Sequence, residues 1–214
     1  MGHARGRSGR RCGRNRRETC WLDRGGFSLL EVVFVAAGAT LLAAMAIPRV
    51  TGMLEDIRVV GAVRYVSSRL QQARMDAVMR AANVALRFDR QAAYRYAVFQ
   101  DGNGNGVLSR DIDRGVDRQI RGAERLSDQF PGVEFGVLPG LPAVDASSTP
   151  PGADPVRVGA SDMVVFSPMG TATAGSLYIR GSRGQQYVIR VFGDTGKTRL
   201  LRFEPRERRW RPLS

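Results

Sequence analysis

The stretch of residues 101–112 carries oxygen-bearing side chains at the spacing of a calcium-binding loop. Gly106 stands sixth in this stretch, where such a loop turns sharply, but the closing twelfth position is Ile112, which offers no side-chain oxygen. Glycine and asparagine also suit a plain turn between two strands, because both tolerate positive φ. The sequence therefore predicts either a turn without metal or a weak structural calcium site, and no other cofactor. The oxygen ligands would come from Asp101, Asn103, Asn105 and Asp111.

The carboxyl end is the second stretch that could do chemistry, because residues 197–211 are strongly basic and have only Glu204 and Glu207 as acids. An extended backbone would place Lys197 and Arg199 on one face of a strand. A basic strip beside an aromatic ring suits contact with nucleic-acid phosphates and stacking on bases. Solvated arginines in a terminal strand are also common without any function, so DNA is one candidate partner. The candidate DNA-binding residues are Lys197, Arg199, Arg202, Arg206, Arg208, Arg209, Trp210 and Arg211.

Cysteine and histidine are confined to the amino-terminal 26 residues, as Cys12, Cys20 and His3. If this leader is removed, the remaining chain has neither residue type. That excludes a cysteine nucleophile, a histidine general base, a zinc site of the usual kind and an intrachain disulfide. We therefore expect no catalytic residues and no enzymatic activity.

A long apolar stretch follows the basic leader. Residues 1–26 contain eight arginines against Glu18 and Asp23, whereas residues 27–47 contain a single charge, Glu31. As a helix, these 21 residues would measure about 31 Å, enough to cross a hydrocarbon core of about 30 Å. The arginines before the span predict that the amino terminus stays in the cytoplasm while the rest faces the periplasm.

Three interpretations of this stretch compete. An ordinary secretory signal would be cut after Ala44-Met45-Ala46, and would then be longer than the usual ~15–30 residues and carry a charge in its apolar region. A plain membrane anchor leaves Glu31 unexplained, since an intramembrane carboxylate costs about 2.5 kcal/mol or more at the helix centre. Cleavage after Gly26 would supply a partner, because the new amine of Phe27 could meet Glu31 of a neighbouring subunit.

Gly26 and the six residues that follow it, FSLLEV, resemble the class III signal of type IV pilins and pseudopilins. In that family, prepilin peptidase cleaves after the glycine and methylates the new terminus, here Phe27. The resemblance implies that Glu31 is required for filament assembly and that Pro48 is the proline that kinks the helix. The leader is longer than many in the family, so a start codon downstream of Met1 would also fit.

The rest of the chain predicts one more helical segment and then strands. Residues 49–82 are amphipathic: Val50, Leu54 and Ile57 recur at helical spacing, as do apolar residues from Val63 to Ala77, and this stripe should pack on the head. Five prolines make residues 138–160 a long surface loop. Glycine-rich turns at 181–184 and 193–196 should connect hairpins. Predicted strands are 84–88, 94–99, 133–137, 163–166, 177–179, 187–192 and 198–203.

Residues 68–74, 166–170 and 193–197 resemble the GspH/FimT group of minor pilins within this superfamily. The run Gly196-Lys197-Thr198-Arg199 is similar to the Gly-Arg-x-Arg motif of FimT-type DNA-uptake pilins, with lysine in place of the first arginine. The resemblance implies an α+β fold, with a long amino-terminal helix packed on an antiparallel β-sheet head. We expect a leader (1–26), a transmembrane and assembly helix (27–48), an amphipathic helix (49–82) and a β-rich periplasmic head (83–214).

The implied function is that of a minor subunit of a type IV pilus or of a type II secretion pseudopilus, held as a single-pass protein in the inner membrane. The expected partners are prepilin peptidase, other pilin or pseudopilin subunits, the inner membrane and, as an alternative function, DNA during uptake. Nothing in the residues distinguishes a pilus from a secretion pseudopilus.

Overall fold

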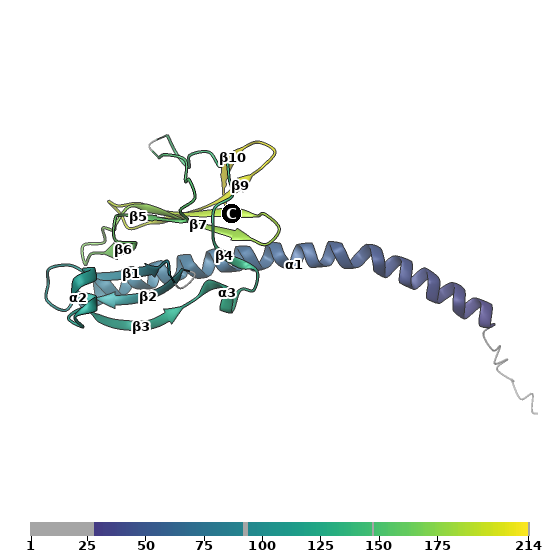
Figure 1. Cartoon of the computed structure of the whole chain (residues 1–214), viewed down its shortest axis with the longest axis horizontal. Helices are drawn as coiled ribbons and strands as arrows, with labels where there is room; N and C mark the ends of the chain where they lie inside the picture. Colours follow the sequence, from purple (N-terminus) through teal and green to yellow (C-terminus); the bar gives the residue numbers. More distant parts are fainter. Residues whose placement is uncertain (1–27, 92–93, 147, 214) are drawn as a thin grey trace, which may run out of the picture. The chain divides into compact units, whose positions relative to one another are not determined.

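The computed structural model describes residues 28–91, 94–146 and 148–213 (Figure 1). The leader, with Gly26 and Phe27, lies outside these residues, so cleavage between the two stays a prediction. The chain divides into a first unit that ends at Met45 and a second unit that begins at Ala46.

The first unit consists, in its described part, of the beginning of helix α1 (Leu29–Arg80). Residues 28–46 are all exposed, including large apolar side chains such as Leu29 and Phe34. Within the described residues, α1 is the helix whose length and composition would allow it to cross a membrane. Pro48 lies inside α1, and the kink expected there stays a prediction.

The second unit contains the rest of α1, whose buried stripe begins later than the sequence indicated. Val63, Val66 and Leu70 are fully buried, as the helical spacing predicts. Leu54 and Ile57 are instead exposed, at 47% and 67%, so their assignment to the packed face was wrong. The reason is that the strands of the head cover α1 only from about Val59, which is the first helix residue in the main core.

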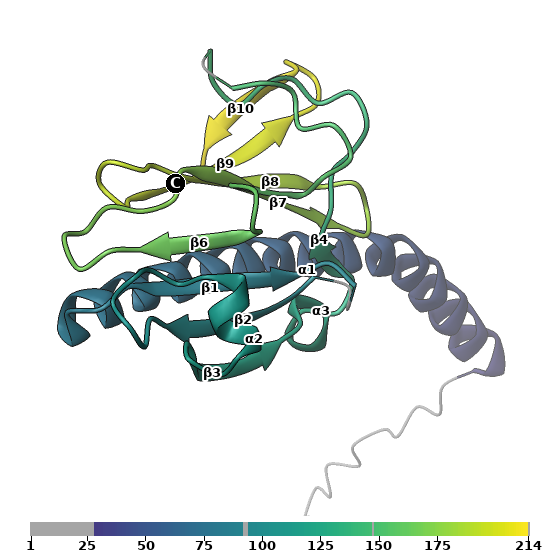
Figure 2. The same cartoon turned by 60° about the vertical axis from the view of Figure 1, so that its left-hand side comes forward.

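Two antiparallel sheets flank this part of the helix (Figure 2). In the first sheet the strands follow the order β3 (Arg118–Glu124), β2 (Arg95–Gln100), β1 (Val84–Asp89), β6 (Met163–Phe166). In the second sheet the order is β10 (Arg209–Pro212), β9 (Thr198–Glu204), β8 (Gln186–Val191), β7 (Gly175–Gly181), β4 (Val133–Phe135), with β5 (Val156–Val158) also paired to β7. Two short helices, α2 (Ser109–Asp113) and α3 (Leu126–Gln129), complete the described elements.

Alternate residues of each central strand face two different apolar clusters. Leu86 of β1 and Ile189 of β8 join the main core against α1. On the outer face of the first sheet, Ala85 packs with Val107 under the segment that follows β2. On the outer face of the second sheet, Tyr178 packs with Val188 and Leu201. Burial on both faces explains why these strands are nearly continuous apolar runs in the sequence.

Three strands differ from the sequence-based prediction. β5 lies inside the predicted loop 138–160, and its Val156 and Val158 are buried. β5 follows directly after Pro155, the last of five closely spaced prolines, and these prolines dominated the prediction. β3 and β10 were missed because both are edge strands rich in arginine, and charge on an edge strand is a common protection against pairing with another chain.

Candidate functional site

Glu31, the predicted assembly residue, lies in the first turn of α1 and is exposed. The neighbouring described side chains from Ser28 to Ala46 are exposed as well. The hydroxyl of Thr40 donates a hydrogen bond to the Ala37 carbonyl of the same helix, at 2.9 Å. Among the described residues of this unit, Glu31 is therefore the ionisable side chain that a neighbouring subunit could contact.

In the predicted calcium loop, the carboxylate of Asp101 accepts hydrogen bonds from the loop itself. One oxygen accepts the backbone N–H groups of Asn103 (3.1 Å) and Gly104 (2.7 Å). The other oxygen accepts the N–H of Gly106 (2.8 Å) and the side-chain amide of Asn83 (2.9 Å). Both oxygens are therefore engaged by donors that organise the turn.

The other acids of this segment are also engaged. Asp117 is buried and accepts the N–H groups of Gly102 (3.0 Å) and Leu108 (2.9 Å). Asp111 is buried and accepts the side-chain amide of Asn105 at 3.1 Å. No group of three or more acidic, cysteine or histidine side chains that could hold a metal occurs among the described residues. The local geometry is that of a hydrogen-bonded turn.

The pKa of Asp101 reflects two opposing influences. Burial alone would raise the pKa, because it disfavours the charged form. The hydrogen bonds from Asn83, Gly106, Gly104 and Asn103 favour the carboxylate and outweigh burial, so the pKa lies below its ordinary value of 3.8. Asp101 is therefore a structural anion at neutral pH.

At the carboxyl end, β9 and β10 form a hairpin in which Trp210 has a structural role. Its ring packs against Tyr178 and Phe203, with ring centroids 6.1 and 5.3 Å away. Its indole N–H donates to the Pro142 carbonyl at 3.1 Å. The ring thus covers the outer cluster of the second sheet, and the structure gives no support to the predicted stacking of bases on Trp210.

The predicted basic residues separate into two groups. Arg209 and Arg211 both pair with Glu207, and Arg208 donates to the Gly140 carbonyl at 3.3 Å. The side chains of the second group are exposed and have no hydrogen-bond or ion-pair partner among the described residues. This second group consists of Lys197, Arg199, Arg202 and Arg206.

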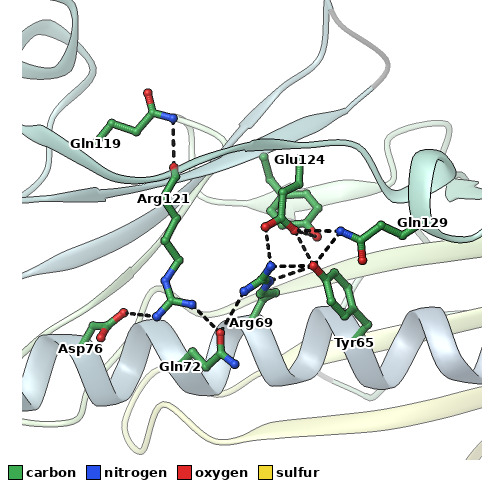
Figure 3. Close-up of polar contacts among 9 residues, drawn as sticks. Tyr65, Arg69, Gln72, Asp76, Gln119, Arg121, Glu124 and Gln129 are labelled. Carbon is green, nitrogen blue, oxygen red and sulfur yellow. Dashed lines mark hydrogen bonds and ion pairs between the residues drawn. The ribbon is translucent and has the colours of Figure 1, made fainter.

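A polar network that the sequence analysis did not identify joins α1 to the edge strand β3 (Figure 3). Glu124 of β3 accepts the hydroxyl of Tyr65 at 2.6 Å and that of Tyr96 at 3.1 Å, and it also pairs with Arg69. Arg69 donates to the Tyr65 hydroxyl at 2.6 Å, and Gln129 of α3 donates to the same hydroxyl at 2.8 Å. The network fastens β3 and α3 onto the helix.

The same network continues one helical turn further along α1. Arg121 of β3 donates to Gln72 at 2.6 Å and to the buried Asp76 at 2.9 Å (Figure 3). Burial, together with the negative charge of Glu124, raises the pKa of Tyr96, so this phenol stays protonated at all ordinary pH values. No sequence signal could have identified the network, because Arg69 and Glu124 are 55 residues apart.

The long amino-terminal helix packed on antiparallel sheets is a pilin-like α+β architecture. A family model described as type II transport protein GspH matches residues 62–195, which is more than half of the chain. The chain therefore belongs to the GspH family, a family of structural pseudopilins of type II secretion. No curated protein and no solved structure matches the chain.

Proposed function

We propose that this chain is a minor subunit of a type II secretion pseudopilus, cleaved by prepilin peptidase between Gly26 and Phe27. The family match over residues 62–195 carries the proposal. The sequence around the cleavage pair and the exposed apolar start of α1 support it independently. The head then lies on the periplasmic side of the inner membrane, and the chain works by assembly with other pseudopilins rather than by catalysis.

In this function, Glu31 pairs with the amine that cleavage creates on Phe27 of an adjacent subunit. A carboxylate in an apolar helix is costly unless it meets a positive charge. Glu31 is exposed, and within the described part of its helix no cation stands near it in the sequence before Arg49. Pairing between subunits would therefore make insertion of this helix into the assembly favourable.

The first test concerns processing. Full-length chain produced together with prepilin peptidase should yield a membrane protein that begins at Phe27, as read by mass spectrometry of the amino terminus. Gly26→Val should leave the precursor uncut. A mature chain that begins at Ile47 would instead establish the ordinary secretory signal and remove the proposal.

The second test concerns assembly. Glu31→Ala should be inserted and cleaved normally but should enter sheared filaments poorly, because the intersubunit ion pair is lost. Thr40→Ala is the matched control, since it removes a polar group of the same helix whose hydrogen bond stays within that helix. Normal incorporation of Glu31→Ala would contradict the pairing.

A second candidate function is DNA binding during uptake, with the basic hairpin as the contact. The observation that favours it is the set of four exposed cations without described partners, Lys197, Arg199, Arg202 and Arg206. If these residues contact phosphates, the affinity for DNA of any sequence should fall by roughly 0.9 log units per contact for each tenfold increase in salt. Lys197→Ala with Arg199→Ala should lower that slope by about two contacts.

The control for this test removes two other exposed arginines, Arg58 and Arg118, neither of which has a described partner. It changes the net charge by the same amount, so it measures the effect of diffuse charge. Equal losses of affinity from both double variants, at near-physiological salt, would contradict a defined DNA site and would leave the pseudopilin role unaffected.

A further inference from the structure

Two turns meet at the end of the second sheet where β8 leads into β9. The Ala172 N–H donates to the Gly193 carbonyl at 2.7 Å, which joins the turn after β6 to the β8–β9 turn. A Cβ added to Gly196 would lie only 2.6 Å from the Gly170 carbonyl oxygen, so the two backbones are closely packed. Thr198 fastens this end to α1, because its hydroxyl contacts Ser67 at 3.2 Å and accepts from Gln71 at 3.0 Å.

Each turn presents a large apolar side chain to solvent. Met169 is 89% exposed, the highest value among the large apolar side chains of the described residues, and Phe192 is 42% exposed. Phe192 stands directly across the hairpin from Lys197, since its N–H donates to the Lys197 carbonyl at 3.0 Å. Leaving both side chains exposed has no benefit for the isolated fold, because burying apolar surface away from water is favourable.

Three cations lie near the same two turns. Lys197 and Arg199 are exposed, and Arg74 of α1 lies beside both turns, with its guanidinium 3.6 Å from the Cβ position of Gly170 and 3.2 Å from that of Gly196. None of the three side chains has a hydrogen-bond or ion-pair partner among the described residues. Asp194, also exposed, is the acid within the β8–β9 turn.

The register of the second sheet adds to this uncompensated charge. Arg199 of β9 lies directly opposite Arg190 of β8, and like charges in this arrangement destabilise a strand pair. Arg190 is partly neutralised by Asp145 at 3.3 Å, whereas Arg199 has no such partner among the described residues. The fold therefore keeps a cation where its own stability would favour a neutral residue.

We propose that the surface formed by Arg74, Met169, Phe192, Lys197 and Arg199, here called the turn surface, docks an acidic segment of another protein of the secretion assembly. An apolar side chain of that segment covers Met169 and Phe192, and its carboxylates pair with the three cations. The inference rests on the proposed function, since it requires the chain to work among partner proteins.

The composition of the turn surface favours a protein over a nucleic acid. Methionine, aromatic residues and arginine are enriched in the cores of protein interfaces, and the flexible thioether of methionine adapts to a partner. The thioether of Met169 offers neither a charge for phosphate nor a plane for base stacking. Trp210, the ring for which the sequence predicted base stacking, instead packs within the fold.

The experiment is site-specific photocrosslinking of the full chain in cells that make the complete secretion assembly. Met169 is replaced by p-benzoylphenylalanine, and in a second strain Ile57, which is 67% exposed, is replaced in the same way. Ile57 and Arg74 are 17 residues apart in α1, about 25 Å along a helix, so this position reports on assembly away from the turn surface. Position 169 should crosslink to one protein through an acidic peptide, identified by mass spectrometry.

Reversal of charge tests the chemistry of the contact. Lys197→Glu with Arg199→Glu should reduce the adduct at position 169 by about tenfold or more, because like charges facing each other across an interface are strongly unfavourable. Arg58→Glu with Arg118→Glu makes the same change in net charge elsewhere and should leave the adduct intact. Lysine in place of the partner's acidic residues should restore the adduct to the charge-reversed chain.

Four outcomes would count against the inference. An adduct at position 57 without one at position 169 would show that the turn surface is bare in the assembly, while the pseudopilin role stands. An adduct that is removed by nuclease would assign the surface to nucleic acid. An adduct insensitive to charge reversal at Lys197 and Arg199 would remove the acidic partner. Absence of adducts at both positions would count against the inference and the proposed assembly together.

Discussion

The Asp101 turn and the turn surface are both charged loops rich in glycine, but they use their charges in opposite ways. Asp101 has four donors within 3.1 Å, all from its own loop or from Asn83. The side chains of Lys197 and Arg199 have no hydrogen-bond or ion-pair partner among the described residues. The difference shows that charge density in a sequence does not reveal whether the fold engages a charged side chain or leaves it exposed to solvent.

The largest expected effect is the loss of stability when Asp101 is replaced by alanine. Asp101→Ala leaves three backbone N–H groups and the Asn83 amide without their acceptor, and each buried donor left unpaired costs about 1–3 kcal/mol. Because water can reach part of the loop, we expect a total loss of about 3 kcal/mol in the free energy of unfolding. The measurement is the denaturant midpoint of the full chain in detergent, with the slope unchanged.

Asp194→Ala is the control for this change, since Asp194 is an exposed aspartate of a similar glycine-flanked turn. Its side chain has no described partner, so the substitution should alter stability by no more than about 0.5 kcal/mol. Similar losses from Asp101→Ala and Asp194→Ala would contradict the view that internal hydrogen bonding distinguishes the two turns.

A smaller effect is expected in the pH dependence of stability, which reports on the charge of the Asp101 carboxylate. The pKa of Asp101 is lower in the folded chain than its ordinary value of 3.8. A carboxylate of this kind contributes stability that is fully present above the unfolded pKa and is lost as the pH falls through the folded pKa. The stability difference between the natural chain and Asp101→Asn should therefore shrink below about pH 4. A difference that is constant from pH 7 to pH 2.5 would show that the carboxylate charge is unimportant.

The sequence predicted the apolar strands far better than the charged edge strands. β1, β6 and β8 were found because burial on both faces makes them apolar runs. The edge strands β3 and β10 are charged, so they lack that pattern.

Which side chains contact one another could be predicted from the sequence even less well than the edge strands. The sequence offered Trp210 and Arg199 as equal members of one basic tail. Only the packing of β10 on β9 shows that Trp210 covers Tyr178, while Arg199 faces Arg190. The Glu124 network likewise depends on the pairing of β3 with β2, which no local pattern encodes.

At the turn surface, a substitution should slightly stabilise the chain. Arg199→Gln removes one of the two like charges that face each other across β8 and β9, so the free energy of unfolding should rise by about 0.2–0.5 kcal/mol. Arg202→Gln, opposite Tyr187, is the control and should give no gain. The gain should vanish in an Arg190→Gln background, as a double-mutant cycle in denaturant would measure. A loss of stability from Arg199→Gln would mean that Arg199 supports the fold.

The smallest expected effect is that of calcium on the Asp101 turn. An ion bound at a hundredfold excess over its dissociation constant would add about 2.7 kcal/mol to stability, a rise in Tm of roughly 5–10 °C for a chain of this size. We expect no change in Tm between millimolar calcium and chelator, because both Asp101 oxygens already accept two hydrogen bonds each. To bind there, calcium would have to displace the donors that hold the turn together. A rise of several degrees that Asp101→Asn abolishes would show that the loop rearranges around the ion, and the turn would then join the binding surfaces of the protein.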